Sequence, residues 1–176
     1  MSSRDTLRAF QSHLASRLQE ARVSGQAASW LGVEVGGGPL LFPLSHAGEI
    51  FAWTPPQRVP YTQPWFLGVA NLRGALSGVI DLGAFVRQGA ASPRGEAALA
   101  QCRLIALNPV LGLNCALLVD RLVGLRGVGA FSASGEPPAG SPTYFGHGYT
   151  DTGGLHWQEI NLQTLSRDPL FLNIGS

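Results

Sequence analysis

The stretch NLRGALSGVIDL, residues 71–82, decides how this chain folds. Two apolar runs, FLGVANL and ALSGVIDL, flank the dipeptide Arg73-Gly74, and glycine permits the positive φ that a two-residue turn between antiparallel strands requires. The stretch therefore predicts a β-hairpin that presents Arg73 at its tip. Asp81 stands at the end of the second run, before the short apolar run GAFV, where an aspartate commonly caps the helical turn that follows.

Short apolar segments extend in both directions from this hairpin. SWLGVEV alternates, which places Leu31, Val33 and Val35 on one face of a strand that GGGP then ends. SHAGEIFAW is mixed and predicts a helical turn that leads into a strand. Loops are expected in the proline-rich residues 55–64 and in 87–101 and 132–143. Further strands are predicted in LLFPL, CRLIAL, LNCALLV, DRLVGLRGV, YFGHGYT and GLHWQEIN, and a short helix in LQTLSR.

So many short strands, with turns at this spacing, predict a mainly all-β fold made of small barrels. The first residues differ, because Leu7, Phe10, Leu14 and Leu18 recur at helical spacing. We therefore divide the chain into an amphipathic helix over residues 1–25 and one domain over residues 26–176. The helix either folds back on that domain or binds a partner, and the sequence leaves both alternatives open.

The composition excludes several functions. The 176 residues are 45% hydrophobic but only 13% charged, with a net charge of +1, so no nucleic-acid or anionic membrane surface is indicated. No lysine is present, which removes P-loop and Schiff-base chemistry. No signal peptide or membrane span is recognisable, so we expect a cytoplasmic protein without membrane insertion. Cys102 and Cys115 flank a strand–turn–strand segment whose pairing places residue 102 opposite residue 119, so we expect two reduced thiols.

The chemistry-bearing residues are scattered. Four histidines lie in no metal spacing, no nucleophile elbow is present, and no two carboxylates after the helix are close in sequence. GVGAFS at 127–132 lacks the third glycine of a dinucleotide fingerprint and is interpreted as a bulge or turn. We therefore expect no metal, no cofactor and no catalysis, although distant residues could still assemble a site in the fold.

The run WFLGVANLRGALSGVIDLGAFV resembles the signature of the CheW-like chemotaxis coupling proteins, in which Asn-Leu-Arg-Gly precedes a strand that ends Ile-Asp-Leu. The resemblance continues through CRLIALNPVLGLNCALLVDRLVGL and, more weakly, through YFGHGYTDTGGLHWQEINLQTL. It covers nearly all of residues 29–166. The N-terminal helix and YTQPWFLGVANLRG are most similar to the PilI branch, which serves type IV pili and twitching motility.

This resemblance implies a noncatalytic scaffold of two intertwined five-stranded SH3-like barrels, with a short C-terminal helix. Such adaptors join the cytoplasmic tip of a methyl-accepting chemoreceptor to the regulatory domain of a CheA-type histidine kinase. The family also pairs the hairpin arginine with a glutamate, which implies Glu49 as the partner of Arg73. The partner-binding residues expected on this basis are Glu49, Asn71, Leu72, Arg73, Gly74, Val79, Ile80 and Asp81.

A second function from a different class stays open at this point. A small-barrel enzyme or a nucleic-acid module could form its site only in three dimensions, from residues far apart in the sequence. A deep polar pocket would favour that alternative, whereas a kinase and a receptor in the genomic neighbourhood or in a pull-down would favour the adaptor.

Overall fold

The computed structural model describes residues 11–13, 15, 16 and 29–176. Residues 11–13, 15 and 16 are helical, but the four apolar residues of the expected N-terminal stripe, Leu7, Phe10, Leu14 and Leu18, lie outside the described residues. The division of the chain at residue 25 therefore stays a prediction.

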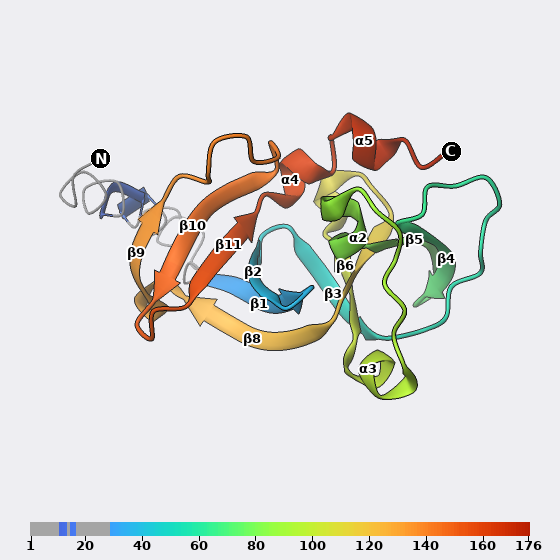
Figure 1. The fold of residues 1–176 in the computed structure, drawn as a ribbon, viewed down its shortest axis with the longest axis horizontal. Helices are drawn as coiled ribbons and strands as arrows, with labels where there is room; N and C mark the ends of the chain where they lie inside the picture. The colour runs from blue at the N-terminus through green and yellow to red at the C-terminus, as the bar shows by residue number, and fades with distance from the viewer. Residues whose placement is uncertain (1–10, 14, 17–28) are drawn as a thin grey trace.

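The described chain forms two β-sheets with interleaved connectivity (Figure 1). The six-stranded sheet has the strand order β8-β1-β2-β11-β10-β9, and the five-stranded sheet has the order β3-β6-β7-β5-β4. The strands of the six-stranded sheet are β1 (Ser29–Val35), β2 (Gly38–Pro43), β8 (Arg121–Gly127), β9 (Phe131–Gly135), β10 (Phe145–Asp151) and β11 (His156–Ile160). Those of the five-stranded sheet are β3 (Ala47–Ala52), β4 (Phe66–Leu72), β5 (Ala75–Asp81), β6 (Arg103–Leu107) and β7 (Cys115–Val119).

From residue 29 onward the chain forms β1 and β2 of the six-stranded sheet, then all strands of the five-stranded sheet, and then β8 to β11 of the six-stranded sheet. Two strand pairs are parallel: β2 with β11, which joins the first and last parts of the six-stranded sheet, and β5 with β7. All other strand pairs are antiparallel. The mainly all-β fold of two intertwined SH3-like barrels is thus confirmed. One sheet has six strands rather than five, because β9 begins at Phe131 and extends into residues 132–143, which the sequence predicted to be a loop.

The helices from residue 29 onward are short. They are α2 (Leu82–Arg87), α3 (Glu96–Gln101), α4 (Leu162–Leu165) and α5 (Pro169–Leu172), with 3-10 turns η1 (Pro109–Leu111) and η2 (Val128–Ala130). Helices α2 and α3 lie between strands, and α4 and α5 follow the last strand. The predicted helical turn after Asp81 and the helix within LQTLSR are confirmed as α2 and α4. Residues 87–101, predicted to be a surface linker, lie at the surface over α3 but contain this helix, which the prediction missed. GVGAFS forms the turn η2 and the start of β9.

Strand β1 contributes to the core with both of its faces. Leu31 and Val33 are buried in the largest hydrophobic cluster and Val35 packs against it, as the alternation predicted. Trp30 points to the other face, where its ring lies 5.0 Å from that of Tyr149 in a separate aromatic cluster. The two clusters fill the space on either side of β1, and this dense apolar packing fixes where the strands that carry the site can lie.

The two cysteines are free and buried. The β6–β7 register pairs Arg103 with Val119, so Cys102 lies far along the ladder from Cys115, as the predicted strand pairing required. Within the part of the chain that the structure describes, no helix is long and apolar enough to span a bilayer.

Candidate partner-binding site

The tip of the β4–β5 hairpin has the geometry that its sequence predicted. Leu72 and Ala75 pair across it, and the two residues between them, Arg73 (φ 51) and Gly74 (φ 81), both adopt positive φ. A two-residue turn with positive φ at both positions matches the twist of the flanking strands. The side-chain oxygen Oδ1 of Asn71 accepts the Gly74 N–H at 2.8 Å and so fixes the turn. The backbone therefore presents Arg73 in one defined direction.

Arg73 forms an ion pair with Glu49, and the two atoms Nη2 and Oε1 lie 2.5 Å apart. The pair that the family resemblance implied is therefore present. Glu49 belongs to β3 and Arg73 follows β4, which are opposite edge strands of the five-stranded sheet. Their contact means that the sheet curls until its two edges approach one another. No regularity within the local sequence encodes such a contact.

The ion pair is exposed to solvent, with 77% of the Arg73 side chain and 40% of the Glu49 side chain accessible. Such a pair contributes about 0 to 1 kcal/mol to folding, because water screens both charges. Large apolar side chains near these two residues in the strands, Ile50 on β3 and Leu76 on β5, are also exposed. The edge thus combines one oriented charge pair with uncovered apolar surface, which suits binding of another protein.

The remaining predicted site residues separate into two groups. Asn71 and Gly74 are exposed at the tip, whereas the Leu72 side chain is buried. Val79, Ile80 and Asp81 lie in the interior and are not brought to the surface with Arg73. Placing these three among the contact residues is therefore corrected: Val79 packs in one hydrophobic cluster and Ile80 in another, so both faces of this end of β5 are covered. They support the hairpin from inside.

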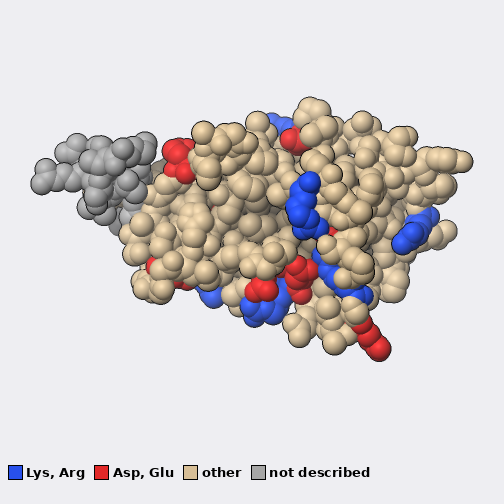
Figure 2. Space-filling view, in the orientation of Figure 1, with Lys and Arg blue, Asp and Glu red and all other residues tan. Residues whose placement is uncertain are grey.

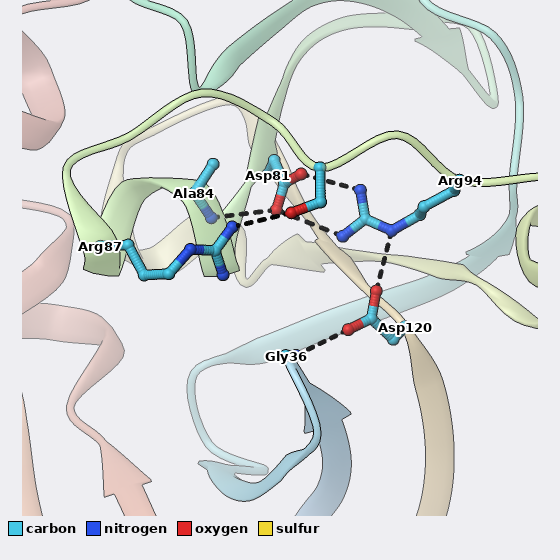
Figure 3. A network of polar contacts seen from close by, with 7 residues as sticks. Gly36, Asp81, Ala84, Arg87, Arg94 and Asp120 are labelled. Atoms are coloured by element: carbon cyan, nitrogen blue, oxygen red, sulfur yellow. Dashed lines mark hydrogen bonds and ion pairs between the residues drawn. The ribbon is translucent and has the colours of Figure 1, made fainter.

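Asp81 is the centre of a polar network that the sequence did not predict (Figure 3). Its Oδ1 accepts the Ala84 N–H at 3.2 Å, which confirms the predicted cap of α2. The guanidinium of Arg94 donates from Nη1 to Asp81 Oδ2 and from Nε to Asp120 Oδ1, both at 2.8 Å. The other oxygen of Asp120 accepts the Gly36 N–H at 2.7 Å. One arginine thus joins the end of β5, the β7–β8 junction and the β1–β2 turn.

Burial favours the neutral form of Arg94 and by itself would lower its pKa. The hydrogen bonds and charges of Asp81 and Asp120 outweigh burial and raise the pKa of Arg94 above its usual range. Only 13% of the Arg94 side chain is exposed and that of Asp81 is fully buried. This cation therefore stays charged and bound to its carboxylates. It is committed to the fold and not available to a ligand.

Charged side chains are few on the face drawn in Figure 2. They gather near the middle of the molecule, over the region where the two sheets meet in Figure 1, and most of the remaining face is uncharged. Among the described residues, no group of three histidine, cysteine, aspartate or glutamate side chains could hold a metal ion. Two of the histidines contact neighbours: His147 pairs with Glu136 at 3.1 Å, and its ring lies 4.5 Å from that of His13.

The cysteines lack the setting of a reactive thiol. Burial raises the pKa of Cys115 to about 12, and burial also raises the pKa of Cys102. Because the thiolate is the reactive form, both side chains behave as small apolar core residues at neutral pH.

Comparisons with known proteins agree with this geometry. A family model described as the CheW-like domain matches residues 29–168. The chain is 27% identical over 113 residues to Protein PilI of Pseudomonas aeruginosa, an alignment that covers 64% of this chain and 60% of that protein, so less than two thirds of the relative's length is matched. Its fold is similar to that in the crystal structure of the scaffolding protein TtCheW from Thermoanaerobacter tengcongensis, with a TM-score of 0.62 and 19% identity over 78% of this chain and 86% of that one.

Proposed function

Because the chain belongs to the CheW-like domain family, we propose that it is a noncatalytic adaptor that couples a methyl-accepting chemoreceptor to a CheA-type histidine kinase. It would act in the cytoplasm, in a chemosensory system that controls type IV pili and twitching motility. The similarity to Protein PilI supports this choice of system, and the similarity to a scaffolding protein supports the adaptor role.

The observation that carries the proposal is the ion pair at the hairpin tip. Arg73 is exposed yet held in one pose by Glu49 and by the Asn71-fixed turn. A free surface arginine loses about 2 kcal/mol of rotamer entropy when a partner orders it. Here the fold has already limited that freedom, so Arg73 is prepared for contact. The exposed side chains of Ile50 and Leu76 supply the apolar surface.

The kinase regulatory domain is the partner that we assign to this edge. The family resemblance implies that this domain is itself built of similar barrels, so the edge of one barrel would pack against the edge of another. In this arrangement Asn71, Leu72, Arg73, Gly74 and Glu49 shape or form the contact, and the buried Val79, Ile80 and Asp81 keep β5 in register beneath it.

An adaptor of this kind changes kinase activity only by differential binding. Receptor and adaptor together favour one conformational population of the kinase, and the adaptor needs no chemistry of its own. The adaptor alone should therefore leave autophosphorylation unchanged, and the receptor should act on the kinase only when the adaptor is present.

Reconstitution tests this proposal directly. Kinase and receptor are mixed with the wild-type chain, with no chain, or with Arg73→Glu, and autophosphorylation is followed with and without receptor ligand. Arg121→Glu is the matched control, because Arg121 also forms an exposed ion pair, with Glu34 at 2.7 Å, but in the six-stranded sheet. Receptor control of the kinase should require the wild-type or control chain. Equal activity and equal ligand response with and without the chain would refute coupling.

A further inference from the structure

The loop that joins β3 to β4 lies apart from the hairpin tip and has its own surface. It borders a groove of about 620 Å³, whose walls include Trp53, Arg58, Tyr61 and Phe66. Trp53 also borders a second hollow of about 470 Å³, which Glu96 and Leu99 of α3 line as well. The two hollows share one aromatic wall, and together they form what we call the Trp53 groove.

The loop that lines the Trp53 groove is fixed in place by the backbone. The Gln57 N–H donates to the Val69 carbonyl at 2.8 Å, and the Val69 N–H donates back at 2.9 Å. This close approach needs glycine at position 68, where φ is +135° and a Cβ would lie 2.1 Å from the Gln57 oxygen. At the other end of the loop, the Gln63 N–H donates to the Ile174 carbonyl at 2.7 Å. The groove is therefore formed before any ligand arrives.

Tyr61 is held in a strained backbone conformation that exposes its ring. Its φ is 58°, in the left-handed region that bulky residues rarely adopt, and 87% of the residue is accessible to solvent. The Ser176 N–H donates to the Tyr61 carbonyl at 3.1 Å and helps to hold this conformation. Trp65, four residues later, is instead buried against Phe85 and Phe171. Strain of this kind gathers where a protein contacts a ligand, and exposed aromatic rings are typical anchors of interfaces.

The Trp53 groove also presents hydrogen-bond donors. Within the described part of the chain, the indole N–H of Trp53, the hydroxyl of Tyr61 and the guanidinium of Arg58 donate to no protein group. The surface therefore offers aromatic faces and donors. Its chemical complement is a segment that is rich in apolar rings and carbonyl acceptors and poor in N–H donors.

We propose that the Trp53 groove binds an extended, proline-rich segment of a partner protein that carries acidic residues at the end nearest Arg58. A polyproline II helix is preformed, makes no internal hydrogen bonds and leaves its carbonyls free, and it docks in aromatic-lined grooves. The aromatic walls pack against the proline rings, and the donors contact the carbonyls. Arg58 attracts the acidic end, because it has no carboxylate partner among the described residues. This inference goes beyond the proposed function and does not rest on it.

The test uses the full chain and three fluorescein-labelled synthetic peptides, followed by fluorescence anisotropy. The peptides are Asp-Asp followed by eight prolines, Arg-Arg followed by eight prolines, and Asp-Asp followed by eight alternating glycine and serine residues. The acidic proline peptide should bind at least about tenfold more tightly than the other two. Equal binding of the proline and glycine-serine peptides, or no binding of either, would overturn the proposal.

Variants connect the binding to the groove. Tyr61→Ala should weaken binding of the acidic proline peptide at least about tenfold. Tyr61→Gly, which suits the left-handed backbone and removes the same ring, should weaken binding to the same extent. Arg58→Glu should reverse the preference toward the Arg-Arg peptide. Leu155→Ala, an exposed apolar control in the turn between β10 and β11, and Arg73→Glu should leave Kd unchanged. The Arg73 control separates this surface from the proposed kinase site.

Nuclear magnetic resonance of the indole N–H groups supplies an independent readout. On addition of the acidic proline peptide, the Trp53 resonance should shift and those of the buried Trp30 and Trp157 should not. A shift confined to the resonances of the buried indoles would contradict binding of the peptide at the Trp53 groove. Concentration-dependent dimerisation that Tyr61→Ala abolishes, without peptide binding, would show that a second copy of the chain occupies it and would also overturn the proposal.

Discussion

Two arginines of this chain bind carboxylates in opposite surroundings. Arg73 pairs with Glu49 at the surface, whereas Arg94 joins Asp81 and Asp120 against the interior. An exposed pair contributes about 0 to 1 kcal/mol to folding, but loss of one partner of a buried pair costs about 3 to 5 kcal/mol. The same functional groups therefore have different roles. Burial makes Arg94 a structural residue, whereas exposure leaves Arg73 available to a partner.

Loss of Arg94 should give the largest effect on stability. Arg94→Ala leaves the buried Asp81 carboxylate with only the Ala84 N–H as a partner and disconnects the β1–β2 turn from β5. We expect the free energy of unfolding, measured with urea, to fall by about 3 kcal/mol or more. Arg121→Ala, which breaks an exposed pair, is the control and should change it by less than about 1 kcal/mol. A similarly small change for Arg94→Ala would contradict the distinction between the buried Arg94 network and the exposed Arg73 ion pair.

Thiol labelling of Cys115 should show that the loss of Arg94 also makes local unfolding of strand β7 easier. Cys115 belongs to β7, which pairs with the strand that carries Asp81, and burial raises its pKa to about 12. In a Cys102→Ala background at pH 8, Arg94→Ala should accelerate alkylation of Cys115 about 100-fold or more, because 3 kcal/mol less is needed to expose it. Arg73→Ala should leave the rate unchanged. Equal rates in the two variants would contradict the comparison.

The raised pKa of Cys115 also predicts how stability depends on alkaline pH. The folded chain holds the thiol proton that the unfolded chain releases above pH 9, so the contribution of the protonated thiol is complete below pH 9. It should be lost progressively as the pH rises toward 12. Cys115→Ala should flatten that part of the stability curve, and an unchanged slope would refute the assignment.

Asp120 should give an intermediate effect. Asp120→Asn keeps one oxygen, which can still accept the Gly36 N–H or the Arg94 Nε–H, but it removes a charge-assisted hydrogen bond. We expect a loss of about 1.5 to 3 kcal/mol in urea unfolding. A loss equal to that of Arg94→Ala would mean that Asp120, and not Asp81, dominates the network.

Arg73 should give the smallest effect on folding. Arg73→Ala removes a solvated ion pair and touches no core residue, so the free energy of unfolding should change by less than about 0.5 kcal/mol. Differential scanning calorimetry of the variant checks this expectation. A large drop in melting temperature would show that the hairpin tip is part of the stability of the fold.

The Arg73 turn could be predicted from the sequence, whereas the Arg94 network could not. The Arg73 turn was predictable because Arg-Gly between two apolar runs is a local signal. Its partner Glu49 followed only from the family resemblance, because the contact depends on curling of the whole sheet. Arg94 was missed because it lies in a small, polar segment without periodicity, 13 residues from Asp81 and 26 from Asp120.

Strand β9 was missed for a similar reason, whereas helix α3 (EAALAQ) consists of good helix formers and was missed although the signal was local. FSASG is short, small and polar, and it becomes a strand only because β10 offers it an edge. The interior position of Val79, Ile80 and Asp81 was likewise a consequence of long-range packing, since Val79 and Ile80 belong to two different hydrophobic clusters on the two faces of β5. Local patterns predicted most of the strands and helices, whereas contacts between distant segments decided which charged residues are buried.

The most direct test of the central claim is calorimetric titration of the chain with the regulatory domain of the cognate CheA-type kinase. Arg73→Glu should weaken binding at least about tenfold without changing the fold, because reversal of an oriented charge at an interface is strongly unfavourable. The swap Arg73→Glu with Glu49→Arg should recover part of the lost affinity, and Arg121→Glu should match the wild type. Unchanged affinity for Arg73→Glu would contradict the assignment of the hairpin tip as the kinase-binding edge.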